Sequence, residues 1–201
     1  MKIEVKNSLP DVKVNINQKE EDSFEILLER VERKPIGSIK CGDIITIGRY
    51  DFIVLEQFNG ATAIVAKNPI KFMPFGADGN YKTSDVRKYC NGEFYKELCG
   101  IVGKNNILSH IVDLTADDGS NKGATVKDNV SIITCELYRY YRGFIPAIGS
   151  ACWTATRPTI TNEAYGNYSC CIAPGGVIDW FNSDFPRGVR PFLCLRSSVL
   201  I

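Results

Sequence analysis

The residues of this chain best suited to chemistry are its eight cysteines and its single histidine, His110. A cysteine, His110 and Asp113 could supply a nucleophile and a base, because a thiol attacks electrophiles once a neighbouring imidazole takes its proton. His110 lies within the apolar run "ILSHIVDL", however, and no catalytic motif surrounds it. We therefore expect a packed or edge-strand histidine, no catalytic residue and no enzyme, with the cysteine site as an open alternative.

The spacing of the possible metal ligands predicts no metal site and no cofactor. No Cys-x-x-Cys pair occurs, and structural zinc usually takes closely spaced pairs of ligands. The stretches "GADGN" and "DLTADDG" lack the full ligand series of a calcium-binding loop, and "GADGNYK" lacks the Gly-Lys-Ser/Thr ending of a phosphate-binding loop. Most of the cysteines lie in apolar runs, so we expect reduced core thiols; they are Cys41, Cys90, Cys99, Cys135, Cys152, Cys170, Cys171 and Cys194.

Composition limits the partners of the chain. The 201 residues are 44% hydrophobic and 23% charged, which is enough for a sizeable core. Lys and Arg total 24 against 23 Asp and Glu, so no net field attracts nucleic acid or an anionic membrane. No run of about eighteen apolar residues occurs, and no export signal is evident. We expect a cytoplasmic protein, in a host cell or a phage virion, with neither nucleic acid nor membrane as a partner.

The elements that must position these residues fall into two parts. Residues 1–34 form a candidate β-rich, charged arm: "KIEVK" and "DVKVNI" alternate as strands do, and "NQKEEDSFEILLERVERK" fits a helix or an edge strand. The arm offers a surface through which a second copy could pair. The alternative is a solvated segment whose Phe24, Ile26 and Leu27 pack on the core.

From residue 35 onward the pattern predicts an α+β domain. Three β-rich runs, separated at Gly48-Arg49 and Asn59-Gly60, indicate a β-meander. The segment 83–103 predicts two short helices that break at Asn91-Gly92, with Thr83 or Ser84 as the cap. Further strands are expected at "ILSHIVDL", at the start of "VSIITCELYRYY", which then becomes helical, and in the C-terminal third. Because helices and strands are segregated, we expect two or three short helices and a C-terminal antiparallel sheet.

Five motifs in order give the chain a resemblance to a known group. They are "YKTSDVRKYCNGEFYKEL", "TVKDNVSIITCELYRYY", "WTATR", "GGVIDW" and "GVRPFLCL". From about Gly42 to Ser198 the chain resembles a bacterial and phage family of unknown function that carries a Trp-Leu-Arg-Ser motif and a closing Gly-Val-Arg-Pro. Here Tyr89-Cys90-Asn91 stands where the family has Trp-Leu-Asn. "WTATR" replaces Trp-Leu-Arg-Ser, and its arginine, Arg157, is shifted from the position that the motif gives it. This shift argues against a shared catalytic arginine.

The ending is also similar to C-type-lectin-like folds, in which a Trp strand, a Gly-centred hairpin and a Gly-x-Arg strand close a small sheet under a ligand surface. This resemblance implies a lectin-like domain over residues 35–201, with Trp153, Gly188, Arg190 and Pro191 as structural residues. The calcium signatures of the lectins are absent. The superfamily includes a formylglycine-generating oxidase with paired cysteines and copper, so Cys170 or Cys171 with Cys194 is an alternative site.

The C-terminal third separates core residues from candidate ligand residues. Strand-interior types predict core positions for Trp153, Val177, Ile178, Val189, Phe192 and Leu195, and Arg190 should bind a carboxylate or strand-end carbonyls. Binding loops favour Tyr, Trp, Ser, Gly and Asn, whereas ordinary turn chemistry is the alternative explanation for the same residues. The candidate ligand residues are Asn162, Tyr165, Asn167, Tyr168, Asp179, Trp180, Asn182 and Asp184.

Three functional hypotheses follow. The first is a non-catalytic binding module, of phage or prophage origin by resemblance, that presents residues 156–187 to a protein or glycan. The second is a phage-encoded intracellular inhibitor of a host defence protein. The third is a cysteine-dependent enzyme of the formylglycine-generating type.

Overall fold

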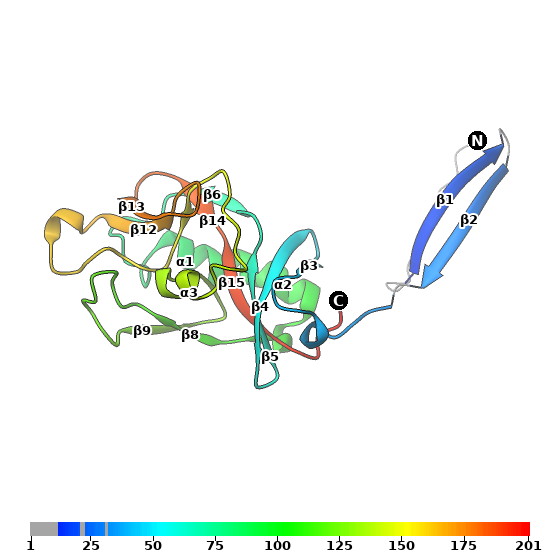
Figure 1. Ribbon diagram of the computed structural model, residues 1–201, viewed down its shortest axis with the longest axis horizontal. Coiled ribbons are helices and arrows are strands. Elements are labelled where there is room, and N and C mark those ends of the chain that lie inside the picture. The colour runs from blue at the N-terminus through cyan, green and yellow to red at the C-terminus, as the bar shows by residue number, and fades with distance from the viewer. Residues whose placement is uncertain (1–11, 21–22, 31) are drawn as a thin grey trace.

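The computed structural model describes residues 12–20, 23–30 and 32–201, so the predicted strand "KIEVK" lies outside the described residues. The protein has a mixed α+β fold in which two sheets share one body, and a two-stranded hairpin stands away from it (Figure 1). Within the described residues no helix is long and apolar enough to cross a membrane.

The first sheet contains the predicted meander. Strands β3 (Ile44–Ile47), β4 (Tyr50–Phe58) and β5 (Ala61–Ala66) are consecutive and antiparallel. Asn59 and Gly60 both have positive φ, 46° and 75°, which a two-residue hairpin turn requires. The sheet continues from β5 to β15 (Pro191–Arg196) and then to β10 (Val130–Ile132), and β7 (Ile107–Leu108) also pairs with β15. The meander is therefore confirmed as one half of a larger sheet.

The second sheet has the order β13-β12-β11-β14-β6. Its strands are β6 (Lys71–Met73), β11 (Cys152–Trp153), β12 (Tyr168–Ile172), β13 (Ile178–Asn182) and β14 (Arg187–Val189). The prediction of one antiparallel C-terminal sheet is wrong in two respects. Strand β14 runs parallel to β11, and "GVRPFLCL" divides at Arg190, so that β14 and β15 belong to different sheets. Pro191 has no backbone N–H, which favours such a break.

One helix replaces the two that the sequence predicts over residues 83–103. Helices α1 (Asp85–Tyr89) and α2 (Tyr95–Val102) are joined by a π-helical turn, η2 (Cys90–Phe94). Ser84 is the cap, since its Oγ accepts a hydrogen bond from the backbone N–H of Arg87. Asn91 widens the helix instead of breaking it, because its side chain bonds to the backbone of Asn129 and Val130. The π-helical turn thereby fixes the helix to the strand that follows Asn129.

Two further elements complete the body. Strands β8 (His110–Asp113) and β9 (Thr125–Asp128) form a separate antiparallel pair, so the segment predicted as the polar loop "TADDGSNKGATVKDN" ends in a strand. Helix α3 (Cys135–Tyr140) follows β10, as predicted. Short 3-10 turns lie at η1 (Ile36–Ser38), η3 (Lys104–Asn106) and η4 (Glu163–Tyr165).

Two apolar clusters lie on opposite faces of the first sheet. The larger packs Phe52, Phe94 and Trp153 together, and the smaller packs Ile53, Tyr138 and Phe192.

All eight cysteines are free thiols, and six of them are buried, which confirms the prediction that they are not disulfide-bonded.

The N-terminal hairpin consists of β1 (Val12–Glu20) and β2 (Ser23–Arg30). Phe24, Ile26 and Leu27 are exposed, so the alternative in which they pack on the core is wrong. The chain enters the body at Lys34, whose backbone exchanges two hydrogen bonds with Ile201. Pairing with a second copy through this arm stays a prediction.

Candidate ligand-binding surface

The hairpin of β12 and β13 carries half of the predicted ligand residues. Its register pairs Tyr168 with Asn182, Cys170 with Trp180 and Cys171 with Asp179. Directly paired residues of antiparallel strands share a face, so Tyr168, Cys170, Trp180 and Asn182 lie on one side of the hairpin. Asp179 lies on the other side, with Phe181, which packs against the core and under Arg187.

Three aromatic side chains meet on the Trp180 side and form what we call the aromatic cluster: Tyr165, Tyr168 and Trp180. The ring centroid of Tyr165 lies 4.8 Å from that of Trp180 and 5.8 Å from that of Tyr168, and Tyr168 lies 5.8 Å from Trp180. All three pairs are edge-to-face, an arrangement that aromatic quadrupoles favour. Trp180 remains 44% exposed, so the cluster offers a rigid apolar surface to solvent.

Most of the predicted polar ligand residues are engaged within their own loops. Asn162 caps η4 by accepting from the N–H of Ala164 at 3.0 Å. The Nδ2 of Asn167 donates to Asp184 at 3.0 Å, and the Oδ1 of Asn182 accepts from the N–H of Asp184 at 2.9 Å. These bonds are the turn chemistry that the sequence left as an alternative. The polar residues therefore hold the aromatic cluster in place, and the aromatic rings make up its accessible face.

The loop before β12 is held from two sides. Gly79 approaches β12 so closely that a Cβ there would lie 2.3 Å from the carbonyl oxygen of Tyr168, and its φ is +59°. Arg157 donates from Nη2 to the carbonyl of Gly166 at 3.3 Å. Only glycine fits at position 79, because any side chain would displace the strand that carries Tyr168.

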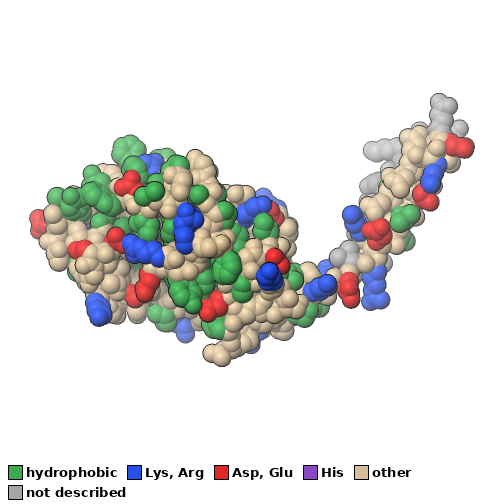
Figure 2. Space-filling model, in the orientation of Figure 1, with side chains coloured by type: hydrophobic (Ala, Val, Ile, Leu, Met, Phe, Trp, Pro, Cys, Tyr) green, Lys and Arg blue, Asp and Glu red, His purple; other side chains and the backbone are tan. Residues whose placement is uncertain are grey.

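Sequence reasoning missed three exposed apolar residues near this surface. Val177, predicted as core, is 65% exposed, and that prediction is wrong because β13 begins one residue later and Val177 belongs to the turn. Phe185 and Ile160 are also exposed. Figure 2 shows hydrophobic side chains gathered on this end of the body, over β12 and β13. The sequence does contain a signal for Phe185, because this residue is the only large apolar side chain in the polar loop "NSDFPRG".

The residues assigned structural roles are buried. Trp153 donates from Nε1 to the carbonyl of Met73 at 3.0 Å, and Gly188 lies against Cys152 and Pro69 too closely for any side chain. Arg190 is 3% exposed and donates from Nε to the carbonyl of Ala66 at 2.8 Å, as the carbonyl alternative predicts. Its Nη2 has no partner among the described residues, and burial lowers the pKa of the guanidinium. Pro191 begins β15 and is buried in the first sheet.

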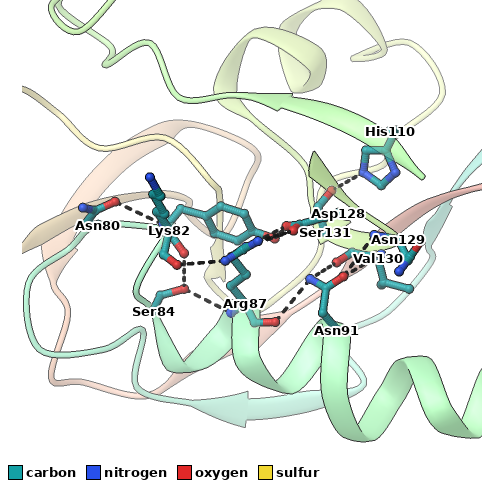
Figure 3. Close-up of polar contacts among 11 residues, drawn as sticks. Asn80, Lys82, Ser84, Arg87, Asn91, His110, Asp128, Asn129, Val130 and Ser131 are labelled. Carbon is teal, nitrogen blue, oxygen red and sulfur yellow. Dashed lines mark hydrogen bonds and ion pairs between the residues drawn. The ribbon is translucent and has the colours of Figure 1, made fainter. Parts of the chain in front are cut away.

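A second polar group lies inside the body, where α1 meets β9 (Figure 3). Asp128, which is 3% exposed, accepts from Arg87 at 2.7 to 3.1 Å and from the hydroxyl of Tyr81 at 3.1 Å. Arg87 forms a bidentate pair with the buried carboxylate and neutralises its charge. This cluster ties the helix to the β8–β9 pair.

His110 lies beside that cluster, and its Nε2 is 2.8 Å from the Oγ of Ser131. The ring packs edge-on against Phe192, and burial lowers the pKa of the imidazole. Asp113 instead accepts bonds from Thr115, and the charged neighbour of His110 is Asp128. Ser131 is 1% exposed, and His110 is half-buried. The structure thus does not bring His110 and Asp113 together.

Comparison with known proteins leaves the family open. Protein-family models, curated proteins and solved structures were all compared with the chain, and none of the three comparisons found a match.

Proposed function

We propose that the protein is a non-catalytic binding module of the C-type-lectin-like kind, of phage or prophage origin, and that residues 156–187 present its ligand surface. The ligand is a protein or a glycan, and it contacts the aromatic cluster. The sequence resemblance motivates the fold family, and the geometry of β12 and β13 motivates the position of the surface.

The observation that carries this proposal is the exposed, preorganised aromatic cluster. Rings that are already packed edge-to-face lose little conformational entropy when a ligand covers them. Trp and Tyr also provide large apolar area with a polar edge, which suits both sugar rings and protein surfaces. The neighbouring amides and carboxylates fix one another, so the cluster keeps its shape without a ligand.

Two arrays test the proposal, one of bacterial surface glycans and one of bacterial surface proteins, each probed with the intact chain. We expect a reproducible ligand on one array and a loss of at least about tenfold in affinity for Trp180→Ala, because central aromatic residues dominate interface energetics. Phe58→Ala is the matched control, since Phe58 is 43% exposed on the far meander. It should bind as the wild type does.

The outcome also distinguishes the ligand classes. Hits on the glycan array alone identify a glycan, and hits on the protein array alone identify a protein. Binding that survives both Trp180→Ala and Tyr168→Ala would place the ligand surface elsewhere on the molecule and refute the proposal.

A further inference from the structure

Two buried cysteines from different elements lie close together, and one of them is on the strand that carries Tyr168. Cys135 is the first residue of α3, and Cys170 lies in the middle of β12. Thr156 connects their backbones: its Oγ1 accepts from the N–H of Cys135, and its carbonyl accepts from the N–H of Cys170, both at 2.9 Å. Thr154 also contacts both residues: its Oγ1 lies 3.4 Å from the sulfur of Cys135 and donates to the carbonyl of Cys170 at 3.0 Å.

The polar surroundings distinguish the two sulfurs. Interaction with the Cys170 thiol lowers the pKa of the Cys135 thiol, and the hydroxyls of Thr154 and Thr156 act in the same direction. The same interaction raises the pKa of Cys170. Burial raises the pKa of Cys194 to about 11 and of Cys171 to about 12. These directions, and the contact of its sulfur with the hydroxyl of Thr154, favour Cys135 as the attacking thiol and Cys170 as the second thiol.

Cys135 also borders an opening to solvent. A cavity of about 300 Å³ is lined by Asp117, Thr134, Cys135, Arg139 and Thr156, among others. Arg139 and Asp117 pair across it at 2.8 Å. Cys135 is only 1% exposed, so the site favours a small reactant such as a peroxide.

We propose that Cys135 and Cys170 form a redox-active dithiol that hydrogen peroxide converts reversibly into an intramolecular disulfide. The Cys135 thiolate attacks one oxygen of the peroxide, the O–O bond breaks, and the sulfur becomes a sulfenic acid as hydroxide leaves. The Cys170 thiol then attacks that sulfur, so that the S–S bond forms, the S–O bond breaks and water leaves. The hydroxide takes up the proton that Cys135 had released. In total two thiols lose two electrons, and one peroxide becomes two water molecules.

The strand register places Cys170 next to the proposed ligand surface, so the oxidation should affect that surface. Cys170 is paired directly with Trp180, and the two side chains lie on the same face of the hairpin. A bond from Cys170 to α3 would pull on the middle of β12, and the environment of Trp180 should change with it. An effect on ligand binding rests on the proposed function, whereas disulfide formation does not.

The test treats the intact chain with increasing hydrogen peroxide, blocks remaining thiols by alkylation, and locates the products by peptide mass spectrometry. The eight free thiols should fall by two, a Cys135–Cys170 peptide should appear, and dithiothreitol should reverse both changes. Cys170→Ala should leave Cys135 as a sulfenic acid that dimedone traps, because the second thiol is missing. Cys135→Ser should abolish the disulfide.

Cys171→Ala is the matched control, because Cys171 neighbours Cys170 on β12 but points to the opposite face. It should form the Cys135–Cys170 disulfide as readily as the wild type, and circular dichroism should show that each variant is folded. The proposal is overturned if other cysteines are oxidised while Cys135 and Cys170 stay reduced, or if Cys170→Ala yields no sulfenic acid. A disulfide that forms without any array ligand would leave this inference standing even if the proposed function fails.

Discussion

Removing the carboxylate of Asp128 should lower the free energy of unfolding more than removing any surface ion pair would. The substitution Asp128→Ala deletes the acceptor of three hydrogen bonds from Arg87 and of one from Tyr81. The side chain of Asp128 is only 1% exposed, so no water replaces the lost partner on the inner side. Three donor groups, the Nε and Nη2 of Arg87 and the hydroxyl of Tyr81, would then lose their acceptor.

The magnitude follows from the exposure of the two partners. Breaking a fully buried ion pair costs roughly 3 to 5 kcal/mol, because an uncompensated charge remains. The side chain of Arg87 is 28% exposed and can turn part of its guanidinium to water, which reduces the cost. We expect a loss of about 2 to 4 kcal/mol in the free energy of unfolding. In a chain of this size the melting temperature should fall by roughly 5 to 15 °C.

The assay is urea unfolding of the wild type, Asp128→Ala, Arg87→Ala and the double variant. The double-mutant cycle should give a coupling of about 1 to 3 kcal/mol between the two positions. Glu93→Ala is the control, because its pair with Lys71 is solvent-exposed and should contribute less than about 1 kcal/mol. If Asp128→Ala matches Glu93→Ala, the reasoning from burial is wrong.

Four further outcomes are expected. Phe192→Ala should cost about 3 to 5 kcal/mol in a urea melt through the cavity it leaves in the smaller core. Arg190→Ala should cost about 2 to 4 kcal/mol, whereas Arg190→Met, which fills the volume and removes a charge without a carboxylate partner, should cost clearly less. Tyr168→Ala and Asn182→Ala should each change the unfolding free energy by less than about 1 kcal/mol. Burial lowers the folded pKa of His110, so its contribution is complete above the unfolded pKa of about 6.5 and is lost as pH falls below it; His110→Gln should remove that part of the pH dependence.

A thiol titration of the denatured, unreduced protein should count close to eight free thiols, and a chelator should leave the melting temperature unchanged. Several fewer thiols, or a melt that a chelator lowers, would contradict the prediction of reduced, metal-free cysteines.

Local signals in the sequence were enough to predict the meander and α3. The Asn59-Gly60 turn needs positive φ at both residues, and few other dipeptides provide it. Thr134 caps α3 by accepting from the N–H of Leu137, which is a short-range bond that residue type alone suggests. Such interactions span three or four residues, so a pattern along the chain can reveal them.

The features that the sequence could not reveal depend on distant partners. Asn91-Gly92 is a helix breaker by local preference, but the bonds from Asn91 to Asn129 and Val130 stabilise a π-helical turn instead. Likewise "GVRPFLCL" is apolar on both sides of Arg190 because both of its halves are buried, and no change of periodicity shows that the chain passes from one sheet to the other there. Only the tertiary partners of β14 and β15 distinguish them.

The same distinction separates the two kinds of residue on the candidate surface. Asparagine and aspartate are common both in turns and in binding loops, so composition could not tell whether Asn167 and Asp184 bind a ligand or each other. Their mutual hydrogen bond gives both residues a role within the turn, although the Oδ1 of Asn167 has no partner among the described residues. Trp180 packs on two tyrosines and keeps an exposed face. A side chain of this size that is 44% exposed, on a strand whose other face packs against the core, is what the proposed contact with a ligand requires.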